Sequence, residues 1–323
     1  MRGLIDVWCQ RGSDASSMDA DARDRLIRLQ AFDFLAQQTQ LHGEVLPWAI
    51  LSKGFAVDGQ RVPLIGPQGI FKPAVLPEIP ISISTAPEID GRPRPYNDGV
   101  DDSGFLVYRY RGTNPQHRDN VGLRLAMQRR VPLIYLFGVV KGEYLPAWPV
   151  YVVGDEPGSL AFHVAVDDKA SLVAKGGPLP AAAEARRSYV TTVTLRRLHQ
   201  ETFRQRVLQA YQQRCAICRL KHTELLEAAH ILPDNHPQGE PVVPNGLALC
   251  ALHHTAFDRN IFGIRPDLIL EVRKDILAET DGPMLLHGLQ AINGTRLDVP
   301  RLETQRPKEE FLEIRYEAFR KAS

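Results

Sequence analysis

The chain has 323 residues, of which 44% are hydrophobic and 24% charged, which is the composition of an ordinary soluble globular protein long enough for two domains. A net charge of +1 excludes a protein that binds nucleic acid through bulk positive charge, and no apolar run approaches the roughly 20 residues that span a membrane. The start of the chain does not read as a signal peptide, so we expect a cytoplasmic, reducing location and no membrane partner.

The first half of the chain predicts a helix followed by a β-rich domain. Residues 1–18 are polar and are expected to form a flexible N-terminus, whereas residues 19–42 carry apolar side chains at helical spacing. A stretch rich in Pro and Gly follows, with runs typical of strands at 80–84, 104–110, 131–138 and 148–153 and a run typical of a helix at 121–127. We therefore expect one domain over residues 19–166.

The second half predicts a linker and a separate domain. Residues 167–188 contain Gly-Gly, two prolines and many small residues, a composition typical of a linker. Residues 189–323 would form the second domain, with helices expected at about 198–213 and 308–321. The expected fold class is α+β.

Four residues of the second domain have the spacing of a structural zinc site. They follow the pattern CxxC, 31 residues, CxxH, and are Cys215, Cys218, Cys250 and His253. Zinc is usually held by four thiolate or imidazole ligands in a closed tetrahedron, and a two-residue gap lets two ligands share one turn. The pattern predicts one structural Zn²⁺; the alternative is that these cysteines are buried packing residues.

A second polar set, interleaved with the first, indicates hydrolytic chemistry. His230 lies in an apolar run, 227–233, that predicts a strand, and Asn245 follows it in the chain. His254 and Asp258 are four residues apart in a predicted helix, so their side chains share one face and can bind one ion. Cleavage of a phosphodiester needs a base that activates water and a cation that stabilises the developing charge.

Together the two sets resemble the HNH (ββα-metal) endonucleases. The resemblance implies metal-assisted phosphodiester hydrolysis, with His230 as the general base and with Asn245 orienting the loop or the base. It also implies that His254 and Asp258 bind the catalytic ion, for which Mg²⁺ or Mn²⁺ is expected at an open, oxygen-rich site.

The chain departs from that family at two places. Ala229 stands where many HNH enzymes carry an acid or a histidine next to the base, so we expect only two protein ligands for the catalytic ion, together with water and phosphate. The CxxH half of the zinc pattern replaces the commoner CxxC. His222 is therefore the alternative to His253 as the fourth zinc ligand.

Residues 95–112 of the first domain carry two tyrosines twelve residues apart, Tyr96 and Tyr108, with Asp98 between them. This segment resembles the base-pocket segment of SRA (YDG) domains, which flip a modified cytosine out of duplex DNA, although the later Tyr-Asp-Gly triplet of that family is missing. The resemblance implies a PUA-like β-barrel in which Tyr96 and Tyr108, or Tyr110, stack on the base and Asp98 accepts a hydrogen bond from its amino group. The alternative is a turn followed by ordinary strand alternation.

A basic segment leads into the zinc pattern. Residues 186–214 contain seven arginines against one acid, Glu201. Basic side chains beside a nuclease site contact DNA phosphates, so we expect backbone contacts from Arg196, Arg197 and Arg204. The alternative is that these arginines form a solvated helix face.

These patterns predict a modification-dependent restriction endonuclease that binds double-stranded DNA containing 5-methylcytosine or 5-hydroxymethylcytosine and cuts it with an HNH site. One alternative is an HNH endonuclease that reads an unmodified sequence or another mark; Gly99 stands where SRA domains often carry an acid, which bears on the base that is read. Another is a DNA-binding protein whose HNH fold is an inactive zinc scaffold. One HNH site nicks one strand, so double-strand cleavage would suggest a homodimer.

Overall fold

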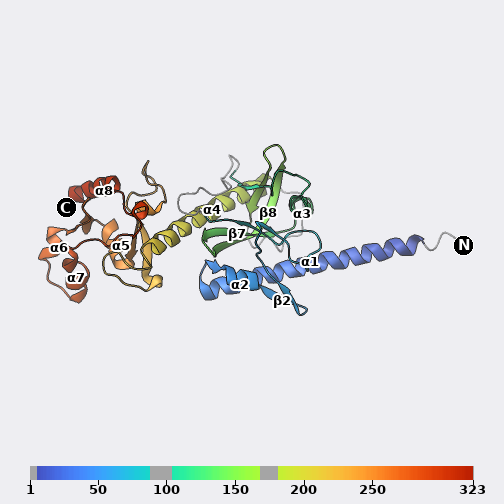
Figure 1. The fold of residues 1–323 in the computed structure, drawn as a ribbon, viewed down its shortest axis with the longest axis horizontal. Helices are drawn as coiled ribbons and strands as arrows, with labels where there is room; N and C mark the ends of the chain where they lie inside the picture. Colours follow the sequence, from blue (N-terminus) through green and yellow to red (C-terminus); the bar gives the residue numbers. More distant parts are fainter. Residues whose placement is uncertain (1–5, 88–103, 168–180, 323) are drawn as a thin grey trace. The chain divides into compact units, whose positions relative to one another are not determined.

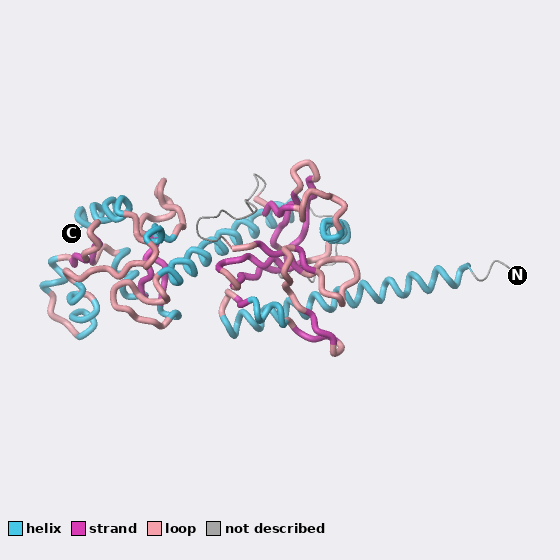
Figure 2. Tube along the Cα trace, viewed as in Figure 1, coloured by secondary structure: helices cyan, strands magenta, loops and turns pink. Residues whose placement is uncertain are grey.

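The computed structural model describes residues 6–87, 104–167 and 181–322, and the chain divides into two compact units, Met1–Leu198 and His199–Ser323. Both units combine helices and strands (Figures 1 and 2), so the predicted α+β class is confirmed. The boundary falls inside one long helix, α4 (Ala181–Ala210), which begins within the predicted linker and includes most of the helix predicted at 198–213. Residues 168–180 of that linker lie outside the described residues.

The Met1–Leu198 unit is built on a seven-stranded sheet with strand order β4-β5-β7-β8-β9-β6 and with β1 paired to β8. Among the described strands, β5 and β7 run parallel and the other neighbours antiparallel. The strands are β1 (Leu46–Pro47), β4 (Ile70–Phe71), β5 (Ser82–Thr85), β6 (Leu106–Arg109), β7 (Leu133–Val140), β8 (Glu143–Glu156) and β9 (Ala161–Val166). A separate hairpin joins β2 (Phe55–Val57) to β3 (Gln60–Val62). The four predicted strands are confirmed as β5, β6, β7 and β8.

Strand β7 is buried on both faces, which explains its unbroken apolar sequence. The helices that cover the sheet with the first half of α4 are α1 (Asp6–His42), α2 (Trp48–Lys53) and α3 (Arg118–Arg129). Leu133 and Tyr135 belong to a core with α3 and α4, whereas Ile134 and Leu136 belong to a second core with α1 and α2. The sheet is therefore the middle layer of this unit (Figure 1).

Helix α1 begins at Asp6, whereas the sequence predicted a flexible stretch up to residue 18 and a helix from Asp19. The stretch from 6 to 18 contains no proline and one glycine, Gly12. Because few residues in it oppose helix formation, the helix continues toward the N-terminus beyond the apolar positions that pack on the sheet.

A buried arginine fastens α1 to the sheet. Arg28 is 2% exposed, and its guanidinium donates hydrogen bonds to the carbonyl groups of Ile79, Pro80 and Pro132. Asp24, one helical turn earlier, accepts two more hydrogen bonds from it, at 2.5 and 3.2 Å. A buried charge is costly unless it is paired and hydrogen-bonded, so these contacts fix where the helix lies.

The sheet curls, because residues from its two ends meet. The hydroxyl group of Tyr108 on β6 donates to the carbonyl oxygen of Ser84 on β5 at 3.2 Å, although three strands separate β6 from β5 in the strand order. Among the described strands, β4 and β6 are the edges of the sheet. The closed SRA-like barrel expected for this domain stays a prediction.

The His199–Ser323 unit contains a ββα motif. Strands β10 (Leu226–His230) and β11 (Gly246–Cys250) pair antiparallel, and helix α5 (Ala251–Asp258) follows at once. The further elements are β12 (Phe262–Ile264), β13 (Leu270–Val272), α6 (Lys274–Ala278), α7 (Pro283–Gly288) and α8 (Glu309–Ala322). The second half of α4 packs with β10, β11, α5 and α8 in one core. The predicted strand at 227–233 and the predicted helix at 308–321 are thus confirmed as β10 and α8.

None of the helices in the described ranges combines the length and the apolar character needed to cross a membrane.

Replacing Arg28 with methionine should make the Met1–Leu198 unit easier to unfold. The change leaves a carboxylate and three backbone carbonyls without their donor, and removing one partner of a buried ion pair costs about 3–5 kcal/mol. All three tryptophans of the chain lie in this unit, so urea unfolding followed by tryptophan fluorescence reports on it. Arg23→Met on the same helix removes only an exposed pair with Asp58 and should cost about 1 kcal/mol or less. Equal stability losses in the two variants would contradict the role given to Arg28.

Candidate functional site

The four predicted zinc ligands come together in the structure. Cys215, Cys218, Cys250 and His253 each offer one ligand atom, and these atoms all lie within 4.8 Å of one another. Nδ1 of His253 lies 3.4 Å from Sγ of Cys215 and 3.2 Å from Sγ of Cys250. The sulfur atoms of Cys218 and Cys250 are 3.9 Å apart. A zinc tetrahedron with Zn–S bonds of about 2.3 Å has edges of roughly 3.8 Å, so this donor set fits one zinc ion.

His253 turns the correct nitrogen toward the sulfur atoms. It is 1% exposed, and its Nε2 lies 2.9 Å from the carbonyl oxygen of Gly288. A carbonyl only accepts, so Nε2 carries the proton and Nδ1 is left for the metal. His222, the alternative ligand, is exposed before the turn Thr223–Leu225, and the ligand cluster found among the described residues does not include it.

The thiols of the cluster share their protons unequally. Hydrogen bonding from Cys250 lowers the pKa of Cys215 to about 3, against its burial and with help from His253. The same contact raises the pKa of Cys250. A coordinating metal ion deprotonates thiols outright, so the cluster is a chemical fit for Zn²⁺.

The register of β10 and β11 places His230, the candidate general base. His230 pairs with Gly246 at the end of the two-stranded ribbon. Phe203 of α4 stacks on the imidazole, with ring centroids 4.0 Å apart and 13° between the ring planes. Gly246 permits this close approach, because a Cβ atom there would lie 2.4 Å from Val207 and 2.9 Å from the Phe203 ring. The stacked ring therefore limits how far the His230 imidazole can turn.

Asn245 fixes the loop that follows His230. Its side chain is fully buried, and its amide group donates to the carbonyl oxygens of Leu232 and Glu240, both at 3.0 Å. Its carboxamide oxygen accepts from the backbone N–H of Leu232 at 2.9 Å. These contacts fit the loop-orienting role that the family resemblance implies for Asn245.

His254 lies between two carboxylates. Its Nε2 is 3.3 Å from Oδ2 of Asp258, one turn later in α5, and its Nδ1 is 2.5 Å from Oε2 of Glu227 on β10. All three side chains reach solvent. An open set of carboxylate and imidazole donors suits a hard divalent ion that keeps several water ligands. The sequence did not single out Glu227, because its contact depends on where β10 lies beside α5.

Burial favours the neutral form of the His230 imidazole. Its burial lowers the pKa of His230 below the usual value; the charges of Asp234 and Asp258 act in the opposite direction and that of His254 in the same direction. The Nε2 atom is 3.0 Å from Oδ1 of Asp234, without the alignment of a hydrogen bond. A neutral imidazole can take a proton from water, as a general base must. Asp234 is a second neighbour that the sequence did not indicate.

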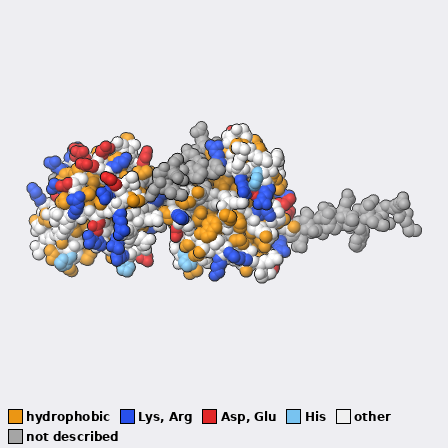
Figure 3. Space-filling view, in the orientation of Figure 1, with side chains coloured by type: hydrophobic (Ala, Val, Ile, Leu, Met, Phe, Trp, Pro, Cys, Tyr) orange, Lys and Arg blue, Asp and Glu red, His pale blue; other side chains and the backbone are white. Residues whose placement is uncertain are grey.

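Two of the three predicted DNA-backbone arginines, Arg197 and Arg204, have partners within the chain. The guanidinium of Arg204 donates to the carbonyl oxygens of Thr223 and Leu226, at 3.1 and 3.0 Å, so it fastens α4 to the start of β10. Arg197 pairs with Glu44, and both side chains are about half exposed or more, whereas Arg196 is exposed. On the face shown in Figure 3, basic and acidic side chains are interspersed on both units. Phosphate contact stays a prediction for all three arginines, and Arg204 also makes hydrogen bonds within the chain.

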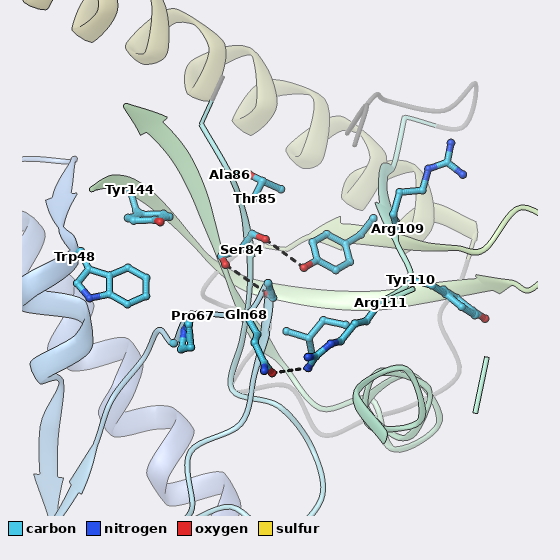
Figure 4. A pocket seen from close by; sticks show the side chains of 14 residues that line it. Trp48, Pro67, Gln68, Ser84, Thr85, Ala86, Arg109, Tyr110, Arg111 and Tyr144 are labelled. Atoms are coloured by element: carbon cyan, nitrogen blue, oxygen red, sulfur yellow. Dashed lines mark hydrogen bonds between the residues drawn. The ribbon is translucent and has the colours of Figure 1, made fainter. Parts of the chain in front are cut away.

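The Met1–Leu198 unit has a cavity of about 330 Å³ where the sheet curls. Trp48, at the start of α2, and Tyr144, on β8, lie on one side of it (Figure 4), with ring centroids 6.0 Å apart at 50°. The two are close because Leu46 of β1 pairs with Tyr144. Tyr108 also lines the cavity. The walls therefore offer three aromatic side chains, of which the sequence predicted only Tyr108.

One polar side chain of the cavity has a fixed orientation. Arg111 donates hydrogen bonds to Oε1 of Gln68 and to Asp119 (Figure 4 shows the first). A guanidinium only donates, so the Gln68 amide turns its oxygen to Arg111 and keeps its NH₂ group for another acceptor. Aromatic faces together with an N–H donor suit a planar heteroaromatic ring such as a nucleobase.

Of the other predicted pocket residues, Tyr110 is the one that lies in the described part of the chain. Tyr96 and Asp98 lie outside the described residues. Tyr110 borders the cavity, but its side chain points away from it (Figure 4) and stacks on Phe162, with centroids 4.5 Å apart. Its hydroxyl group is hydrogen-bonded to Asp155. Since strand residues alternate between faces, Tyr108 and Tyr110 were expected on one side; the end of β6 at Arg109 breaks that alternation.

Comparison with known proteins identifies the second unit. Residues 215–265 match the family model described as HNH endonuclease, so the chain contains an HNH endonuclease domain. A solved structure, "Modification dependent TagI restriction endonuclease", is similar at 16% sequence identity and a TM-score of 0.26, covering 75% of this chain and 82% of that one. No curated protein matches the chain.

Elemental analysis of the purified protein should find about one zinc per chain, because the four donors complete a tetrahedron. Cys215→Ser should lower both the zinc content and the melting temperature, since zinc binding and folding are coupled in such sites. His253→Ala should lose zinc, and His222→Ala is the matched control that should keep it. Zinc retained in His253→Ala and lost in His222→Ala would reverse the assignment of the fourth ligand.

Proposed function

We propose that this chain, which carries an HNH endonuclease domain, is a modification-dependent DNA endonuclease. It binds duplex DNA containing 5-methylcytosine or 5-hydroxymethylcytosine and hydrolyses phosphodiester bonds. The observation that carries the nuclease part is the ββα arrangement, in which one α-helix places His254 and Asp258 beside the strand that ends at His230. An inactive zinc scaffold would not need a carboxylate–histidine pair beside a neutral, stacked imidazole.

The cleavage chemistry divides between the residues of this motif. His254 and Asp258 would hold Mg²⁺ or Mn²⁺, which stabilises the negative charge that develops on the phosphate and on the leaving oxygen. His230 takes the proton of the water that attacks phosphorus. Phe203 and Asn245 hold the imidazole and the following loop. One such site cuts one strand, so cutting both strands would take two copies of the chain.

The reading of the modified base is assigned to the cavity of the Met1–Leu198 unit. A base flipped out of the duplex needs aromatic faces on which to stack and polar groups that read its edge. Trp48, Tyr144 and Tyr108 supply the faces, and the NH₂ group of Gln68 is a donor for the O2 or N3 acceptors of cytosine. Tyr96 and Asp98 remain predicted contacts of the same base.

His230→Ala should abolish cleavage while leaving DNA binding and zinc content unchanged. Loss of a positioned general base costs about two to four orders of magnitude in rate. The rate is measured under single-turnover conditions with Mg²⁺ or Mn²⁺, on matched plasmids with and without cytosine modification. His287→Ala, an exposed histidine on α7, is the control and should cut normally. Cutting at a near-wild-type rate by folded His230→Ala would remove His230 from this role.

Trp48→Ala should weaken binding to modified duplex by about one to two decades, because stacking is worth roughly 1–3 kcal/mol per base. Binding to the unmodified duplex should change little, since phosphate contacts dominate it. Trp48→Phe keeps an aromatic face and is the matched control. The measurement is a pair of binding curves at fixed salt on one duplex with and without the modification. Wild-type protein that binds both duplexes equally would instead favour a reader of unmodified sequence.

A further inference from the structure

Glu227 makes the shortest polar contact of the HNH motif, and the family pattern does not account for it. The residue beside the base is Ala229, which brings no polar atom to the site. Glu227 stands two residues earlier on the same strand, and side chains two apart on a strand lie on one face. Its carboxylate reaches Nδ1 of His254 at 2.5 Å. An acid is therefore present at the site, but it stands two residues before the position next to the base.

The distances distinguish a metal ligand from a hydrogen-bond acceptor. Neighbouring ligands of an octahedral Mg²⁺ or Mn²⁺, each about 2.1 Å from the ion, are roughly 3 Å apart. The 3.3 Å between Nε2 of His254 and Oδ2 of Asp258 suits two ligands of one ion. At 2.5 Å, Nδ1 of His254 and Oε2 of Glu227 are closer than two such ligands would be, and their contact is a short hydrogen bond.

The two edges of the His254 ring also face different neighbours. The edge of the ring that carries Nε2 faces Asp258. The opposite edge faces Glu227. An ion held at Nε2 would thus also reach the Asp258 carboxylate, whereas an ion at Nδ1 would take the place of the contact with Glu227.

We propose that Glu227 is a positioning residue that accepts the Nδ1–H proton of His254 in a hydrogen bond and so presents the Nε2 lone pair, together with Asp258, to the catalytic cation. A neutral imidazole has one N–H and one lone pair, and the partner of the first nitrogen decides which tautomer forms. The carboxylate also raises the ligand strength of the ring and holds its orientation. This inference rests on the proposed nuclease function.

The test measures Mn²⁺ affinity by the electron paramagnetic resonance signal of free Mn²⁺, on full-length protein whose zinc content is checked. Glu227→Ala should weaken Mn²⁺ binding about 10–100-fold. Glu227→Gln, which keeps a carbonyl acceptor for the Nδ1–H group, should recover most of this loss. Glu224→Ala removes an equal charge from an exposed residue three positions earlier and should bind Mn²⁺ like the wild type.

The second readout is the tautomer of His254, from nitrogen-15 NMR of the imidazole, which a merely structural role of Glu227 would not change. The wild type and Glu227→Gln should show the Nδ1–H form, and Glu227→Ala should shift toward Nε2–H.

Unchanged affinity and tautomer in Glu227→Ala would overturn the positioning role while leaving the nuclease intact. If Glu227→Gln and Glu227→Ala lost Mn²⁺ affinity equally and the tautomer of His254 did not change, Glu227 would be a direct metal ligand. That result would also overturn the positioning role. A wild-type protein that neither binds Mn²⁺ nor cuts DNA would refute the proposed function itself.

Discussion

The pairing of β10 with β11 is the constraint on which the nuclease site depends. Two strands of five residues are marginal alone, so both ends of the ribbon are secured. Cys250, a member of the Cys3His cluster that could hold a metal ion, lies at one end, and Asn245 ties the loop at the other. A register slip of one residue would turn His230 to the opposite face of the ribbon. The Cys3His cluster and Asn245 therefore stabilise the strand register that sets the position of His230.

Helix α4 contributes residues to the cores of both units, and several of its arginines make contacts within the chain. Leu195 and Leu198 belong to a core of the first unit, and Phe203 belongs to the core of the second. Arg187 pairs at 2.6 Å with Asp167, whose side chain is fully buried, and Arg204 binds backbone carbonyls. Several arginines of the basic segment 186–214 thus bind other groups within the chain.

The features that the sequence predicted correctly depend on local spacing. The CxxC and CxxH gaps indicated which residues form the Cys3His cluster, an apolar run located β7, and helical spacing located α8. The features that it missed depend on contacts between distant segments. Glu227 meets His254 only through the packing of β10 beside α5, and Trp48 meets Tyr144 only through the pairing of β1 with β8. Local patterns could not show these contacts, nor that Tyr110 turns into the core.

The Asn245–Gly246 pair has a consequence for the chemical lifetime of the protein. Asn-Gly is the dipeptide that most readily deamidates, because the glycine nitrogen can attack the side-chain carbonyl and close a succinimide ring. Here the carboxamide is buried in three hydrogen bonds, and the N–H of Gly246 donates to the carbonyl of Val243. The Gly246 nitrogen cannot approach the Asn245 side-chain carbonyl, so the folded state protects Asn245 from deamidation. Once deamidated in an unfolded chain, residue 245 would have no amide protons for the carbonyls of Leu232 and Glu240, and the refolded molecule would carry permanent damage at the loop after its base.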